Sequence, residues 1–171
     1  MFVLEVLYLF IPAIIANTSP GIAASLRLPG DIPIAASVLG KHKTWRGHIA
    51  SFFGGMMAAY VLHIIAVLSN GAWVTAWYED KWMTLAVLMT VGAKLGDTIK
   101  SGIKRRFQKK EGAPWYPLDQ IDYMIGAILF TMPVTGWIGW KEYAVLIIVP
   151  MVANKPIAIL AHRFGQKRVP W

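Results

Sequence analysis

The stretch that decides the fold runs from Ile49 to Ser69 and reads IASFFGGMMAAYVLHIIAVLS. These 21 consecutive residues include no Asp, Glu, Lys or Arg. About 20 such residues are enough for an α-helix to cross the hydrocarbon core of a bilayer. An Asn-Gly pair at 70–71 follows and marks the end of the helix. The stretch therefore predicts a transmembrane helix.

Four more apolar runs extend this pattern over the rest of the chain. Together with the first stretch they predict spans at about 2–17, 49–69, 82–100, 122–140 and 143–162. The mean hydropathy is +0.50 and only 15% of residues are charged, against about 25% in an ordinary soluble domain. We therefore expect an all-α polytopic membrane protein, one domain over residues 1–171 with about five transmembrane helices.

The first run is expected to be a retained span. It lacks the basic start of a signal peptide and carries Glu5 instead. The Ser-Pro-Gly cluster at 19–21 is a strong breaker and is expected to end this helix near Asn17. Two polar loops, 20–47 and 103–118, then separate the spans.

The basic residues predict the orientation of the helices. Thirteen lysines and arginines belong to the two loops, their borders and the C-terminal tail, whereas only Lys81 and Lys141 fall on the other side. Because cytoplasmic loops carry an excess of Lys and Arg, both loops and the C-terminus are expected in the cytoplasm, with the N-terminus outside. In these positions the net charge of +8 suits anionic lipid headgroups and nucleotide phosphates, and no nucleic-acid partner is expected.

Polar side chains in the third run are the first candidates for chemistry. One helical stripe about 100° wide would collect an anion, a hydroxyl and three cations: Asp97, Ser101, Lys94, Lys104 and Arg105. An ionised group near the bilayer centre costs at least about 2.5–3.5 kcal/mol, so such groups usually face a cavity or a partner. The alternative is an interfacial helix whose long side chains extend to the lipid–water boundary.

Asp119 and Asp122 stand at the start of the fourth run. Their i,i+3 spacing places both carboxylates on one side of a helix. Oxygen ligands suit Mg²⁺, which proteins hold with one or two carboxylates plus substrate phosphates and water. Many lysines and arginines come just before them, as a polyphosphate site requires. The alternative is that the two aspartates only cap the helix N-terminus.

Other polar or small residues have ordinary structural explanations beside a functional one. The stretch 41–48 (KHKTWRGH) leads into the second span, and on composition alone it is positive-inside charge. Gly54, Gly55 and His63 in that span are expected to serve helix packing. Lys155 lies deep in the fifth span, where it needs a counter-charge, a substrate phosphate or a water-filled pocket.

Three motifs occur in order along the chain. Residues 43–47 (KTWRG) match a KTW-x-G element, residues 96–105 match GD-x₃-S-x₂-KR, and residues 117–122 (PLDQID) match P…D-x-x-D. In this the sequence resembles the CDP-archaeol synthase family and, more distantly, the bacterial CDP-diacylglycerol synthases. The bacterial enzymes carry P-G-H-G-G where WYPL stands at 115–118, so the resemblance is to the short archaeal form, over about residues 33–171.

The resemblance implies an enzyme that transfers the CMP moiety of CTP to an unsaturated archaeal ether lipid phosphate. The products would be CDP-archaeol and pyrophosphate, and the active site would lie at the cytoplasmic face of the cell membrane. The attacking lipid phosphate oxygen is already ionised at neutral pH. Catalysis would therefore rest on positioning and on neutralising charge in the transition state.

The resemblance also implies roles for single residues, with Mg²⁺ as the cofactor. The expected metal ligands are Asp97, Asp119 and Asp122, and with Lys104 they form the catalytic set. The residues expected to bind CTP phosphates are Lys43, Thr44, Ser101, Lys104 and Arg105. The lipid phosphate is assigned to Lys94 and Lys155. The expected partners are CTP, an isoprenoid ether lipid phosphate and the bilayer, and a homo-oligomer is left open.

Two alternatives to this function come from other classes. A CTP-dependent polyprenol or phytol kinase of the same superfamily would transfer the γ-phosphate and release CDP. A small transporter or lipid scaffold would carry out no chemistry. Transporters of this kind often contain inverted repeats with broken helices, and the sequence has no internal repeat.

Overall fold

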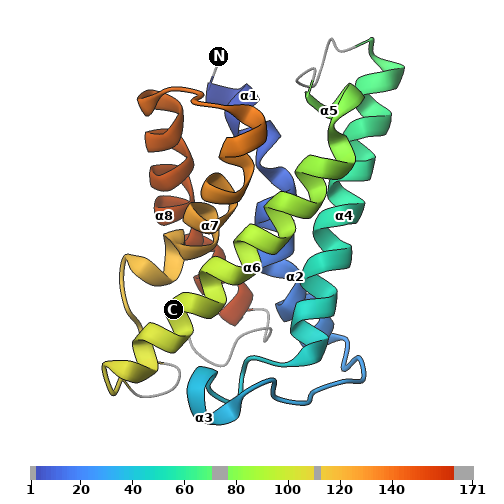
Figure 1. Cartoon of the computed structure of the whole chain (residues 1–171). Coiled ribbons are helices and arrows are strands. Elements are labelled where there is room, and N and C mark those ends of the chain that lie inside the picture. The colour runs from blue at the N-terminus through green and yellow to red at the C-terminus, as the bar shows by residue number, and fades with distance from the viewer. Residues whose placement is uncertain (1–2, 71–76, 110–112, 164–171) are drawn as a thin grey trace.

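A computed structural model describes residues 3–70, 77–109 and 113–163, with side chains left undescribed at 154–155 and 157–163. Within these ranges the chain is all helical apart from loops and one isolated β-bridge (Figure 1). The helices are α1 (Val3–Leu9), α2 (Ile11–Ser25), α3 (Ala36–Leu39), α4 (Trp45–Leu68), α5 (Trp77–Asp80), α6 (Trp82–Arg106), α7 (Leu118–Thr135) and α8 (Trp140–Arg163). The all-helical class is as expected.

The long helices form one bundle in which α6 packs against α7, α4 and α2. The connection that contains α3 and the connection between α6 and α7 lie at the same end of this bundle (Figure 1). The start of α1, the short α5 and the α7–α8 connection lie at the opposite end. We call these the α3 end and the α5 end.

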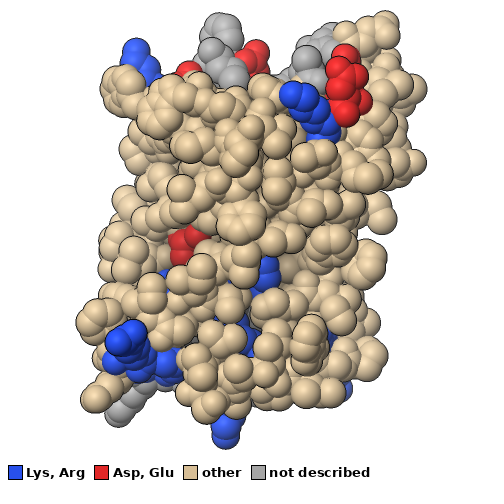
Figure 2. All heavy atoms as spheres, in the orientation of Figure 1, with Lys and Arg blue, Asp and Glu red and all other residues tan. Residues whose placement is uncertain are grey.

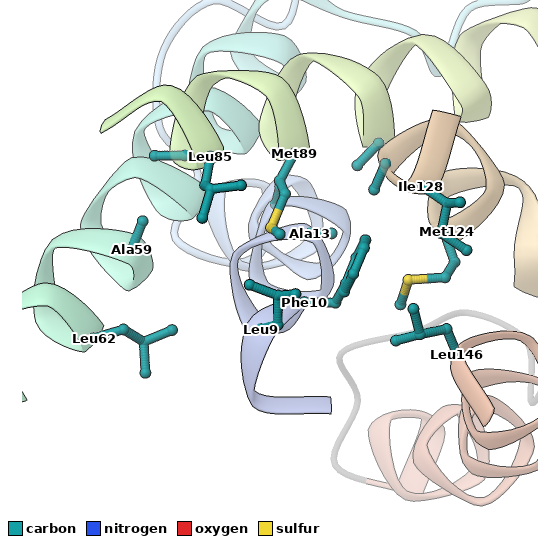
Figure 3. Packing of buried hydrophobic residues seen from close by; sticks show 14 of the residues in the cluster. Leu9, Phe10, Ala13, Ala59, Leu62, Leu85, Met89, Met124, Ile128 and Leu146 are labelled. Atoms are coloured by element: carbon teal, nitrogen blue, oxygen red, sulfur yellow. The ribbon is translucent and has the colours of Figure 1, made fainter. Parts of the chain in front are cut away.

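Apolar side chains from several helices fill the centre of the bundle. Figure 3 shows Leu9, Phe10 and Met89 meeting between helices, with Met124 and Leu146 on the far side of Phe10. All five are at most 1% exposed. Other large apolar side chains lie on the outer surface, and Figure 2 shows a broad, mainly uncharged band between the two ends, in which the few charged atoms are recessed. Such a surface is suited to contact with hydrocarbon or another apolar partner.

The first span differs from the expectation at its proline. The Ser-Pro-Gly cluster at 19–21 does not end the helix, because α2 continues through it; the break falls at Phe10, where α1 and α2 are bent by 50°. Pro20 has no N–H to donate to the Ala16 carbonyl. The Ser51 hydroxyl of α4 donates to that carbonyl instead. Since a neighbouring helix satisfies the free carbonyl, the proline stays inside the helix.

The other helix boundaries also move. The loop expected at 20–47 is shorter, because α2 ends at Ser25 and α4 begins at Trp45. The loop expected at 103–118 loses its first turn to α6. The span expected at 122–140 starts and ends earlier, at Leu118–Thr135. It ends there because Gly136 adopts a φ of +65° and its N–H donates to the Met132 carbonyl at 2.8 Å.

One helix among the described residues, α4, is long enough and apolar enough to cross a bilayer alone, and α1 with α2 meets the same requirement as a bent pair. α6 carries several charged residues and α7 carries two aspartates, so neither helix has the uncharged composition of an ordinary transmembrane helix. The total of five spans stays a prediction.

Glycines bring α6 and α7 into direct backbone contact. A Cβ added at Gly96 would collide with the carbonyl oxygen of Asp122, and one added at Gly126 would collide with the carbonyl oxygen of Gly92. Small residues four apart allow such close approach of helices. Because Asp97 follows Gly96, this contact places Asp97 beside Asp122.

The structural explanations for the second span are confirmed. A Cβ at Gly54 would collide with Ser19 of α2, and one at Gly55 with Thr90 of α6, so both glycines serve helix packing. His63 Nδ1 hydrogen-bonds with the Tyr78 carbonyl at 2.7 Å, and its ring stacks on an aromatic ring of α6. His63 is therefore a packing residue with a satisfied ring nitrogen.

Candidate active site

Seven charged side chains gather toward the α3 end of the bundle, where α6 meets α7 and the loop before α4. We call this group the charged cluster: Lys43, Lys94, Asp97, Lys100, Lys104, Asp119 and Asp122. Their side chains are between 6% and 28% exposed, so water screens their charges only in part. Figure 2 shows a few charged atoms recessed between uncharged ones in this half of the molecule. Four ammonium groups face three carboxylates, which leaves one positive charge in excess.

Lys43 links the loop to α6. Its Nζ contacts the two carboxylate oxygens of Asp97 at 2.6 and 2.5 Å. Lys94 Nζ, one turn earlier on α6, lies 3.2 Å from Asp97 Oδ2. Burial lowers the pKa of the Lys43 ammonium below its ordinary range, although the Asp97 carboxylate opposes that shift. Asp97 is therefore held between cations from two elements.

Backbone pairing in the loop fixes the position of Lys43. Pro33 and Thr44 form an antiparallel bridge, and the Ile34 N–H donates to the Lys43 carbonyl at 2.8 Å. Thr44 is the N-cap of α4, where its Oγ1 accepts from the Gly47 N–H at 3.2 Å. Since the Thr44 hydroxyl acts there as an acceptor, its proton is available to another group.

Lys100 lies between the three carboxylates. Its Nζ is 2.8 Å from Asp119 Oδ1, 2.9 Å from Asp122 Oδ2 and 3.8 Å from Asp97 Oδ1. Carboxylates from two helices thus surround one ammonium group. Lys100 is absent from the sequence candidates, although its i,i+3 spacing from Asp97 is a signal that points to it.

The capping alternative for the two aspartates does not match the structure. The N-cap of α7 is Pro117, and no side chain caps that end. Asp119 Oδ2 instead accepts from the Trp115 N–H at 2.6 Å and pairs with Lys104 at 3.0 Å. Asp119 therefore ties the loop before α7 to α6, and Asp122, one turn further along, faces Lys100.

Three further residues predicted for the site from the sequence are Ser101, Arg105 and Lys155. The Ser101 hydroxyl donates to the Asp97 carbonyl at 2.9 Å, a bond within the same helix. Arg105 is partly buried in the last turn of α6. The side chain of Lys155 lies outside the described residues, so its assignment to the lipid phosphate stays a prediction.

The donors of the charged cluster fit a divalent cation of the Mg²⁺ type. Three carboxylates converge, and Mg²⁺ prefers oxygen ligands. Asp122 Oδ2 is buried, and its partner in the described structure is the Lys100 ammonium at 2.9 Å. No three His, Asp or Glu side chains in the described ranges form a ready metal cage. In the described structure the Lys100 ammonium lies between the carboxylates.

A cavity of about 760 Å³ opens beside the charged cluster. It lies between α2, the loop before α4 and α6, and it shares three residues with the cluster: Lys43, Lys94 and Asp97. Asn17 and His42 also line it. Ligand cavities usually measure about 300–1,000 Å³, and lysines are common ligands of phosphate groups. The cavity is therefore large enough for a nucleotide, and its lysines suit phosphate groups.

Known proteins resemble this chain over its whole length. Residues 1–171 match a family model described as "CarS-like: CDP-archaeol synthase". The CDP-archaeol synthase of Pyrococcus horikoshii is 33% identical over 98% of this chain and 96% of its own length, and that of Pyrococcus furiosus is 31% identical over 99% and 98%. A solved structure described as "Structural insight into an intramembrane enzyme for archaeal membrane lipids biosynthesis" shares the fold, with a TM-score of 0.74, 24% identity and 95% of each chain covered.

Proposed function

This chain belongs to the CDP-archaeol synthase family, and we propose that the charged cluster beside the cavity is its active site. Its activity is CTP-dependent cytidylyl transfer in the synthesis of archaeal membrane lipids. One observation supports this location above all others. Asp97, Asp119 and Asp122, from two helices, converge next to a cation-lined cavity of nucleotide size.

The reaction joins two phosphates. A lipid phosphate oxygen attacks the α-phosphorus of CTP, a new P–O bond forms, and the bond to the β-phosphate oxygen breaks to release pyrophosphate. The acceptor is an unsaturated archaeal ether lipid phosphate. Because its oxygen is already ionised, no side chain has to remove a proton. The protein contributes by aligning the two anions and by offsetting their charge.

Asp97, Asp119 and Asp122 would hold Mg²⁺. A bound metal would supply positive charge to offset the charge of the phosphates and of the leaving pyrophosphate. Each of the three carboxylates has a lysine partner before the substrate arrives: Lys43 pairs with Asp97, Lys104 with Asp119 and Lys100 with Asp122. Such preorganisation reduces the rearrangement needed when charge develops in the transition state.

Basic side chains of the cavity wall and of the last turn of α6 bind the phosphates of CTP. Lys43 belongs to both, so its ammonium can exchange Asp97 for a phosphate oxygen. The Thr44 hydroxyl can donate to the same phosphate, since its oxygen already caps α4. Lys104 and Arg105 bind the phosphates from the last turn of α6, where Ser101 supports the backbone at Asp97.

The lipid phosphate binds nearer the centre of the bundle. Lys94 lines the cavity one turn before Asp97, on the side of the α5 end. An anion there would lie between the nucleotide cavity and the uncharged outer surface along which isoprenoid chains can extend. Lys155 is the second candidate for this phosphate, from the fifth span.

The bundle crosses the membrane with the α3 end in the cytoplasm. Five passes are formed by α1 with α2, then α4, α6, α7 and α8, with the N-terminus outside and the C-terminus in the cytoplasm. The uncharged band of Figure 2 supports this arrangement, as does the description of the structurally similar protein as an intramembrane enzyme. The active site then opens toward cytoplasmic CTP.

Cysteine labelling tests this orientation, because the sequence has no cysteine of its own. Lys109 at the α3 end and Lys141 at the α5 end are both exposed, so each is a suitable position for an introduced cysteine. In intact cells a membrane-impermeant maleimide is expected to label Lys141→Cys and to reach Lys109→Cys only after the cells are opened. The reverse pattern would overturn the proposed orientation.

Turnover by the purified protein tests the function itself. With CTP, Mg²⁺ and the lipid phosphate we expect pyrophosphate and the CDP-lipid as products. EDTA is expected to abolish turnover, and excess Mg²⁺ to restore it. The carboxylates are negatively charged, so they need the metal to interact favourably with phosphate. Release of CDP in place of pyrophosphate would indicate a kinase, and turnover that persists in EDTA would exclude the metal.

A further inference from the structure

We propose that Lys100 occupies the metal position in the nucleotide-free protein and leaves it when a divalent cation and CTP bind. Lys100 would thus be a positioning residue, an internal cation that keeps the carboxylates together until the metal arrives. The inference rests on the proposed function, since it takes the three carboxylates to be the metal ligands.

The position of the Lys100 ammonium carries this inference. It lies 2.8 Å from Asp119, 2.9 Å from Asp122 and 3.8 Å from Asp97. The Lys100 side chain is 15% exposed and that of Asp122 is 6% exposed. Without a cation among them, three carboxylates at this depth would repel one another with little screening by water. Some positive charge is therefore needed there whether or not metal is present.

The neighbouring lysines do not fill this place. Within the described residues Lys43 and Lys94 pair with Asp97, and Lys104 pairs with Asp119. Each of them contacts a single carboxylate from the edge of the group. Lys100 contacts carboxylates of both α6 and α7. Replacing Lys100 therefore removes the central charge and leaves the outer ones in place.

A lysine side chain is suited to such an exchange. Its ammonium group is a compact charge on a flexible four-carbon stem, so it can move several ångströms while its Cα stays in the helix. The contact of Lys100 with Asp97, a residue of the cavity wall, gives the ammonium a route toward a bound triphosphate. Phosphate oxygens would replace the carboxylates as its partners, and the metal would replace the ammonium. Metal and CTP are then expected to bind with positive cooperativity.

Mn²⁺ binding to the Lys100→Met protein tests the exchange without any turnover. In electron paramagnetic resonance titrations of nucleotide-free protein, we expect the variant to bind Mn²⁺ at least about fivefold more tightly than wild type, since a competing cation is gone. In EDTA its thermal unfolding midpoint should be lower than that of wild type, and saturating Mn²⁺ should remove most of the difference.

Two further variants separate the proposed exchange from a general loss of charge. Lys109→Met removes the same charge from an exposed side chain that stacks on Trp115, and it is expected to leave Mn²⁺ affinity unchanged. Lys100→Arg keeps the central charge, so it should restore the metal-free midpoint and bind Mn²⁺ no more tightly than wild type. It also keeps the test decisive if Lys100→Met does not fold.

Two outcomes would contradict the inference, and they can be told apart. If Lys100→Met binds Mn²⁺ like wild type and loses the same stability with and without the metal, Lys100 is an ordinary ion pair and the inference is wrong. If wild-type protein shows no Mn²⁺ site that Asp122→Asn removes, the metal proposal itself fails, and the exchange with it.

Discussion

Replacing Asp122 with Asn is expected to slow cytidylyl transfer by about three orders of magnitude while the protein still folds. The Asp122 carboxylate is buried and pairs with the Lys100 ammonium at 2.9 Å. Asn keeps the shape and removes the charge that a metal ligand needs. Lys100 retains Asp119 at 2.8 Å, so its ammonium is not left alone. Pyrophosphate release and the thermal unfolding midpoint measure the two effects.

Asp80→Asn is the matched control for this variant. It makes the same chemical change on an exposed side chain of α5, at the opposite end of the bundle. We expect turnover within about twofold of wild type, as for surface substitutions away from the site. Near-normal turnover by Asp122→Asn would mean that Asp122 only stabilises the fold through its ion pair.

Gly96→Ala is expected to cost both stability and activity, although it adds one methyl group. That methyl would meet the Asp122 carbonyl oxygen, so α6 and α7 must move apart. Overpacking of this kind costs about 1–3 kcal/mol. The same movement separates Asp97 from Asp122, and a shift of about 1 Å in a catalytic group can cost about a hundredfold in rate. Thermal unfolding and steady-state turnover measure the two losses.

Gly102→Ala, on the same helix, is the control for Gly96→Ala. A Cβ at Gly102 would meet only Leu39 Cδ2, at the ordinary contact distance of 3.7 Å. Alanine is also the better helix former by about 1 kcal/mol, so this protein should be at least as stable as wild type and equally active. Wild-type turnover by Gly96→Ala would show that the close contact of α6 with α7 does not position the site.

The helical class and the family could be predicted from the sequence because both depend on local patterns. An uncharged apolar stretch as long as 49–69 predicts a helix from its own composition, without information from the rest of the chain. The motifs at 43–47, 96–105 and 117–122 identify the family by residue types at fixed spacing, and the comparisons confirm that assignment. The number of spans and the orientation also come from local composition, and they stay predictions.

The course of the first span could not be predicted, because a distant residue decides it. Pro20 within a Ser-Pro-Gly cluster is a breaker by every local rule. The helix continues because the Ser51 hydroxyl, 35 positions from Ala16, satisfies the Ala16 carbonyl. No pattern in the sequence near Pro20 indicates that contact.

Spacing in the sequence grouped most residues of the charged cluster, but it did not indicate Lys100, which lies between the carboxylates. Helical spacing put Asp97 and Lys104 on one stripe and paired Asp119 with Asp122, and the structure brings these residues together. The place of Lys100 between them depends on how α6 crosses α7, which the contacts of Gly96 and Gly126 determine. Spacing along one helix does not reveal such a crossing, and the roles of these residues stay proposals.

The most direct measurement is the binding of Mn²⁺ in the presence of CTP, followed by electron paramagnetic resonance in wild type and in Asp122→Asn. If carboxylates of α6 and α7 hold the cation together, the wild-type protein binds Mn²⁺ and the variant binds it at least about tenfold more weakly. Equal affinity in the two proteins would contradict a metal site built from both helices.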